Sequence, residues 1–176
     1  MSAATFGPDV ARCEVLTFRQ GLLSSMAHDL VLRVTGFRIT VDAAAPSVDA
    51  VFDPRSLRVA TALRDGKVVT GELGAGDVRK IEQAIVGEVL RAERFPEIRF
   101  ASTSVTAREG GYDVVGKLTL TGTTREISAA VAREGNRLEA EVPLDQPHFA
   151  IRPYSALLGA IRVQPRVIVR ISVPAA

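Results

Sequence analysis

Residues 93–127, ERFPEIRFASTSVTAREGGYDVVGKLTLTGTTREI, decide the fold class of this chain. They contain a Phe-Pro corner, an alternating stretch, a Gly-Gly turn, a second alternating stretch and a Thr-Gly-Thr turn into a third. Apolar residues at every second position between short turns are typical of antiparallel strands with one apolar face and one solvent-exposed face. In the second stretch Val114, Leu118 and Leu120 point one way, and Gly116 interrupts their row, which indicates a bulge or a close approach to the backbone.

The same period of two recurs along most of the chain. It covers residues 30–34, 37–41, 48–52, 57–63, 138–144 and 163–173. The phase slips at Gly36, a residue type that tolerates a bulge, so one long bent strand could keep both of its halves apolar inward.

One segment has helical spacing instead. Val78, Ile81, Ile85 and Val89 recur at three- and four-residue intervals, and Asp77 is a suitable N-cap. We therefore expect a mainly β protein: an antiparallel β-barrel of about eight strands with one amphipathic α-helix, folded as a single domain over residues 1–176.

Composition excludes several classes of protein. The 22 basic and 20 acidic residues give a net charge of +2, no Lys/Arg run is present, and Trp is absent, so nucleic-acid binding is not expected. Cys13 is the only cysteine, which excludes an intrachain disulfide and a cysteine-based zinc site. No apolar stretch of about 18 residues predicts a transmembrane segment. The N-terminus lacks signal-peptide features, so we expect a cytoplasmic protein, or a periplasmic one if a leader was removed.

Three motifs are candidates for sites of chemistry. Residues 24–29, SSMAHD, suggest a small hydrolase, but no G-x-S-x-G sequence is present and His28 and Asp29 would diverge on a strand. The two histidines, His28 and His148, show no metal-ligand spacing. The glycines of GELGAGD, residues 71–77, have the wrong order for a dinucleotide loop. We expect no catalytic residue, metal ligand or cofactor.

Several segments resemble the YceI-like family, whose members are lipocalin-like barrels that bind isoprenoids and other long amphiphiles. These segments are HDLVLRVTGF (28–37), RFPEIRFAST (94–103), LTLTGTTREI (118–127) and HFAIRPYSALLGAIRVQPRVIVRISV (148–173). The resemblance implies a non-catalytic carrier that holds a polyisoprenoid, an isoprenoid quinone or a fatty-acid derivative in an apolar barrel cavity.

The residues expected to line that cavity are apolar, and they could instead fill a solid core. They are Phe37, Phe52, Phe95, Phe100, Leu118, Leu120, Phe149, Leu157 and Leu158. His28, Arg152 and Tyr154 are expected at a polar mouth, where they would orient the ligand head, although His28 could instead be satisfied by backbone groups. The alternative function is a protein-interaction or structural module with a filled barrel. A homodimer that forms through an exposed edge fits either function.

Overall fold

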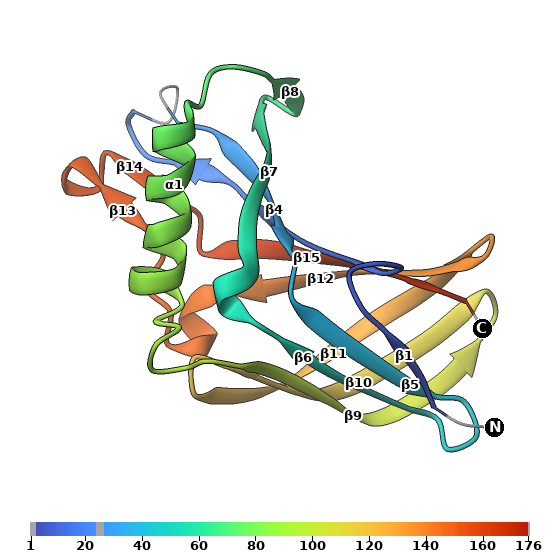
Figure 1. The fold of residues 1–176 in the computed structure, drawn as a ribbon. Helices are drawn as coiled ribbons and strands as arrows, with labels where there is room; N and C mark the ends of the chain where they lie inside the picture. The colour runs from blue at the N-terminus through green and yellow to red at the C-terminus, as the bar shows by residue number, and fades with distance from the viewer. Residues whose placement is uncertain (1–2, 24–26, 176) are drawn as a thin grey trace.

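The computed structural model describes residues 3–23 and 27–175, and Figure 1 shows them as a strongly curled antiparallel sheet with one α-helix at one end. In the order of hydrogen-bonded neighbours, its twelve-stranded main sheet consists of β1 (Ala4–Phe6), β5 (Phe37–Asp42), β6 (Ser47–Phe52), β9 (Ile98–Arg108), β10 (Gly111–Leu120), β11 (Thr123–Glu134), β12 (Arg137–Asp145), β15 (Arg166–Pro174), β2 (Arg12–Thr17), β4 (Asp29–Val34), β7 (Leu57–Arg64) and β8 (Lys67–Val69). The expected mainly β, barrel-like fold is confirmed.

The main sheet has more strands than the expected eight, largely because three long strands are each broken in two. The pieces are β1 with β2, β4 with β5, and β6 with β7. The strand made of β4 and β5 lies between the other two: β4 pairs with β2 and β7, and β5 pairs with β1 and β6. Gly36 lies at the break, as the phase slip predicted, and its carbonyl accepts a hydrogen bond of 2.9 Å from Asp53 N–H. Because β6 also pairs with β9 and β2 with β15, the broken strands join the two ends of the sheet.

A second, smaller sheet projects from the end of the barrel that carries the helix (Figure 1). It consists of β13 (Ser155–Ala156), β14 (Ile161–Val163) and β3 (Arg19–Gln20). Short 3-10 turns lie at η2 (Pro54–Ser56), η4 (Gln146–Phe149) and η5 (Leu157–Gly159). The alternation of apolar residues did not predict this small sheet, because its strands have only two or three residues each.

The helix α1 (Ala75–Ala84) continues into a π-helical turn, η3 (Ile85–Val89). Its N-cap is Gly74, and the expectation that Asp77 would cap it was wrong. Asp77 lies in the first turn instead, where a carboxylate still suits the positive end of the helix dipole. The side chain of Glu82 fastens the helix to the wall, since its Oε1 accepts a hydrogen bond of 3.0 Å from the backbone N–H of Val59 on β7.

Gly116 produces both effects that its sequence position suggested. The register between β10 and β9 shifts between Val115 and Gly116, as at a β-bulge. A Cβ atom on Gly116 would lie 2.6 Å from the carbonyl oxygen of Ala101 and closer still to the ring of Phe100. The missing side chain therefore makes room for the Phe100 ring.

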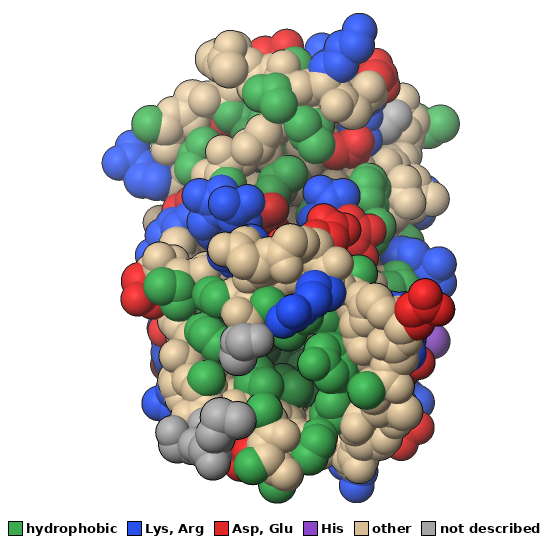
Figure 2. All heavy atoms as spheres, turned by 90° about the vertical axis from the view of Figure 1, so that its right-hand side faces the viewer, with side chains coloured by type: hydrophobic (Ala, Val, Ile, Leu, Met, Phe, Trp, Pro, Cys, Tyr) green, Lys and Arg blue, Asp and Glu red, His purple; other side chains and the backbone are tan. Residues whose placement is uncertain are grey.

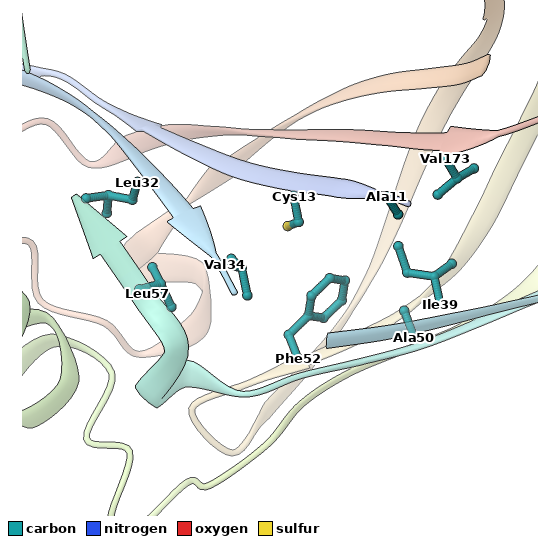
Figure 3. Close-up of a cluster of buried hydrophobic side chains, with 9 residues drawn as sticks. All are labelled: Ala11, Cys13, Leu32, Val34, Ile39, Ala50, Phe52, Leu57 and Val173. Carbon is teal, nitrogen blue, oxygen red and sulfur yellow. The ribbon is translucent and has the colours of Figure 1, made fainter. Parts of the chain in front are cut away.

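The buried apolar residues follow the wall of the barrel. Figure 3 shows one cluster, in which side chains of six strands and of Ala11 face a common interior. A second cluster lies around β10, β12 and η4, and consists of Leu118, Val142, Leu144, Phe149 and Ile151. The two clusters share neighbours such as Leu90, Ile98 and Phe100, so the apolar surface is continuous around the inside.

We expect Gly116→Ala to lower the free energy of unfolding by about 1–3 kcal/mol, because the added methyl group would overlap the Phe100 ring and a backbone carbonyl. Urea unfolding followed by circular dichroism measures the change. Gly87→Ala is the control, since Gly87 is exposed and a Cβ there meets nothing within 4 Å. Equal stabilities for the two variants would contradict the close packing at Gly116.

Candidate ligand-binding cavity

The curled sheet and α1 enclose a cavity of about 1090 Å³. Figure 2 views the face at which the two termini lie and shows a hollow whose walls are mostly hydrophobic side chains. The described strands β2, β4, β5, β6, β9, β10, β11, β12 and β15 all contribute to the wall. The apolar interior that the alternation predicted is therefore hollow.

The period of two explains why the wall is apolar. On β10 the inward residues are Val114, Leu118 and Leu120, as predicted, and the intervening Lys117 and Thr119 do not line the cavity. The neighbouring strands repeat the pattern with Ile127, Ala129 and Val131 on β11 and with Leu138, Ala140, Val142 and Leu144 on β12. Alanines in these rows leave volume unfilled, which allows the interior to stay open.

Seven of the twelve expected site residues line this cavity. They are Phe52, Phe100, Leu118, Leu120, Phe149, His28 and Tyr154. Contact of any of them with a ligand stays a prediction. The remaining five do not line it, for reasons that differ between them.

Phe37 and Phe95 do not line the cavity but pack against neighbouring groups, and Phe37 packs against the inner apolar cluster. The Phe37 ring lies 5.9 Å from the ring of Phe52, its cross-strand neighbour. Phe95 lies against Gly122 in the turn between β10 and β11, and the guanidinium groups of Arg91 and Arg94 each lie 5.1 Å from its ring. The Phe-Pro corner therefore supports a hairpin turn.

Leu157 and Leu158 point away from the interior. Their relative exposures are 62% and 109%, and both have left-handed backbone angles, with φ of 50° and 55°. Arg152 is likewise exposed and outside the cavity wall. The expectation that the two leucines line the cavity is wrong, because they lie in the turn η5, to which the inward–outward alternation of a strand does not apply.

Polar side chains gather at the helix end of the cavity. The Nε2 atom of His28 lies 2.8 Å from Oε2 of Glu72, and the same oxygen lies 2.8 Å from Arg64. Within the described chain, the hydrogen-bond partner of His28 is the Glu72 side chain and not a backbone group, and contact of His28 with a ligand stays a prediction. Because a carboxylate can only accept, Nε2 must carry the proton, and its 3.3 Å contact with Arg64 is then no hydrogen bond.

Glu72 joins this end of the barrel to the segment that leads into α1. The hydrogen bond from His28 is the main cause that holds the pKa of the Glu72 carboxyl below its ordinary value; desolvation opposes it, and the charges of Arg64 and His28 add smaller lowering effects. Nearby, Arg19 lines the cavity. Its guanidinium group donates a hydrogen bond of 2.6 Å to Asp65, and its backbone N–H donates one of 2.7 Å to Asp29 Oδ1. Sequence spacing could not reveal these contacts, since His28 and Glu72 are 44 residues apart.

The other end of the cavity, near the termini, also has polar groups. Tyr112 and Arg133 line it from β10 and β11, and Asp42 and Ser47 line it from the turn between β5 and β6. The sequence prediction missed all four. The alternation could have predicted Tyr112 and Arg133 as inward residues, because each lies two positions from an inward residue, Val114 and Val131 respectively.

Cys13 is a further cavity residue that the prediction missed. Its side chain is buried on β2, and burial, with a smaller effect of the Glu14 charge, raises the pKa of the thiol to about 12. The thiol is therefore protonated at neutral pH and behaves as an apolar wall group.

Two negative findings bear on function. Among residues 3–23 and 27–175, no three His, Cys, Asp or Glu side chains gather as a metal site would require. No helix within those ranges has the length and apolar character needed to span a membrane. Ser24 and Ser25 of the hydrolase-like motif lie outside the described residues.

The profile of the family described as the YceI-like domain matches residues 17–175. This chain belongs to the YceI-like family. No curated protein matches the YceI-like chain significantly in sequence. Two solved structures share its fold over nearly the whole length. Burkholderia cenocepacia BcnA is 17% identical, with a TM-score of 0.63 and 94% and 96% of the two chains covered. A polyisoprenoid binding domain from Saccharophagus degradans, implicated in plant cell wall breakdown, is 11% identical, with a TM-score of 0.61 and 100% and 99% covered.

We expect Glu72→Gln to speed backbone amide exchange several-fold around residues 70–76, because the variant loses the charge that holds Arg64 and His28. A carboxyl with a lowered pKa stabilises the fold above its ordinary pKa of 4.5, and this contribution is lost as the pH falls through the lowered value. The wild-type segment should therefore loosen at acidic pH, while the Glu72→Gln variant should not respond further there.

Hydrogen exchange with mass spectrometry measures both effects. Glu97→Gln is the matched control, since Glu97 pairs only with the exposed Arg99 two residues along the chain. Unchanged exchange in Glu72→Gln at neutral pH would show that the ion pairs do not hold this segment.

Proposed function

We propose that this YceI-like protein is a non-catalytic carrier that holds one long-chain amphiphile, such as a polyisoprenoid, an isoprenoid quinone or a fatty-acid derivative, inside its barrel. The observation that carries the proposal is the continuous apolar cavity of about 1090 Å³. Small-molecule sites usually measure about 300–1,000 Å³. The interior is therefore large enough for a long flexible chain.

The distribution of polar groups supports the same class of ligand. The middle of the cavity is apolar, and each buried methylene group of a tail contributes about 0.8 kcal/mol to binding. Hydrogen-bonding groups lie toward the ends, with His28 and Tyr154 at one end and Tyr112 and Arg133 at the other. Such a site would select a ligand mainly by the length of its apolar chain, and these groups would orient its head.

The comparisons agree with a lipid ligand. The Saccharophagus degradans structure that shares the fold is described as a polyisoprenoid binding domain. At 11% identity, this similarity supports a shared fold only. We infer the class of ligand from the cavity of the present protein.

Two other functions fit the molecule less well. A filled-barrel interaction module would have a solid core, whereas the interior here is hollow. A hydrolase would need an activated nucleophile beside a base. The His28 ring nitrogen is already bonded to Glu72, and the raised pKa of the Cys13 thiol keeps it protonated at neutral pH.

The direct test is mass spectrometry of the purified protein. Native mass spectrometry should show one adduct per chain, and an organic extract of the same sample should contain a polyprenol, an isoprenoid quinone or a fatty-acid derivative in stoichiometric amount. A protein that is empty as purified and also takes up none of these lipids would refute the carrier function.

A pair of neighbouring alanines on β11 offers a sharper test of where the tail lies. Ala129 lines the cavity, whereas Ala130, one residue further, is exposed. We expect Ala129→Phe to fold, because the ring can enter hollow space, and to displace at least two methylene groups of the tail. The loss of about 1.6 kcal/mol would weaken binding roughly 15-fold.

The control, Ala130→Phe, adds the same ring outside the barrel and should bind as the wild type does. Titration with a fluorescent fatty acid measures both affinities. If a folded Ala129→Phe protein bound the chain with unchanged affinity, the tail would not occupy this part of the cavity.

A further inference from the structure

Two short segments bring four leucines together at the helix end of the barrel. We call this group the apolar tip, and it consists of Leu22, Leu23, Leu157 and Leu158. The backbone N–H of Leu23 donates a hydrogen bond of 2.9 Å to the carbonyl of Ala160, and Gln20 pairs with Arg162 in the small sheet. The tip is thus a connected surface, although its two segments are about 135 residues apart in sequence.

The leucines of the tip are turned toward solvent. Leu22 is 94% exposed, Leu157 is 62% exposed and Leu158 is 109% exposed. Leu157 and Leu158 are also consecutive residues with positive φ, a conformation that costs an L-residue roughly 1–2 kcal/mol. Backbone strain that exposes apolar side chains indicates that these side chains contact another molecule.

The apolar tip adjoins the cavity. The small sheet contributes Ile161, Arg162 and Val163 to the cavity region. Tyr154, the residue before β13, also lines the cavity and is 37% exposed. The stem of Arg162 passes close to Gly159, in the same turn as the two strained leucines. A molecule that covers the tip would therefore lie next to one end of the cavity.

The charges around the tip favour an anionic partner. Arg152 and Arg162 are exposed, and within the described chain neither takes part in an ion pair. The acidic groups at this end have partners: Asp65 and Asp29 bond to Arg19, and Glu72 bonds to His28 and Arg64. On α1, the cavity-lining residues Asp77 and Lys80 carry one negative and one positive charge. The exposed arginines are therefore not neutralised by these acidic side chains.

We propose that the apolar tip docks the protein onto a lipid bilayer that contains anionic lipids. The leucines enter the acyl region, Tyr154 lies at the headgroup level, and Arg152 and Arg162 contact phosphate groups. This inference rests on the proposed carrier function, because docking places the end of the cavity where an amphiphile can leave the bilayer. A second protein fits less well, since a stable interface buries about 800 Å² on each partner and uses roughly 20–30 residues.

The test is co-sedimentation with vesicles of phosphatidylcholine, with and without about one third phosphatidylglycerol. The wild-type protein should bind the mixed vesicles more tightly. The double variant Leu157→Asn/Leu158→Asn should bind them at least tenfold more weakly and stay folded, because Asn tolerates the left-handed conformation better than Leu. Arg152→Gln/Arg162→Gln should lose the preference for anionic lipid. The control Val10→Asn changes an apolar side chain that is 45% exposed and lies outside the tip, and it should have no effect.

Uptake of a fluorescent fatty acid from vesicle-free solution separates docking from carrying. Uptake that is equal in the wild type and the Leu157→Asn/Leu158→Asn variant, together with lost vesicle binding, supports docking. Wild-type protein that takes up the fatty acid but binds no vesicles overturns docking and leaves the carrier function intact. Vesicle binding that is unchanged in the double variant also overturns docking, as does a dimer that the double variant abolishes.

Discussion

Three long strands bend at the middle of the wall, and backbone hydrogen bonds hold the bend. The N–H of Asp53 donates to the carbonyl of Gly36 at 2.9 Å, and the N–H of Thr35 donates to the carbonyl of Ser56 at 3.1 Å. On one side of the bend the strands pair toward β9, and on the other they pair toward β15. The curled sheet closes around a cavity because these strands take part in both halves, so the wall depends on this bend.

A hollow barrel gives up the dispersion contacts that a filled core would have. The apolar clusters follow the wall and leave about 1090 Å³ between them, so the empty protein lacks these contacts. An apolar chain that enters the cavity would supply them, and its binding would stabilise the fold by mass action. In such a protein the stability and the affinity for the ligand have the same physical origin.

The sequence predicted the features that local periodicity controls. The inward rows of β10 follow from a period of two, and the bulge at Gly116 and the bend at Gly36 lie where a missing side chain leaves room for close neighbours. The orientation of residues in turns was not predicted. Leu157 and Leu158 are apolar, but they lie in the turn η5 and point outward. The link between His28 and Glu72 also escaped, because it depends on how distant segments meet. The family resemblance predicted an apolar barrel cavity, but it did not show which phenylalanines line that cavity.

The two ends of the wall differ in how they are closed, and this difference bears on how a ligand enters. Near the termini, β1 pairs within the described chain only with β5 and not with β15, and the hollow is visible from that face (Figure 2). At the other end, β7 pairs within the described chain with β4 and β8 and not with β9, and α1 covers the remaining space. The contacts that fasten α1 and its leading segment there include the side chains of Glu82 and Glu72. Separating side-chain contacts costs less than breaking a ladder of backbone hydrogen bonds, so the gap beside α1 can widen and give a second route into the cavity. The apolar tip lies at this same end, which would bring the route beside α1 close to a docked bilayer.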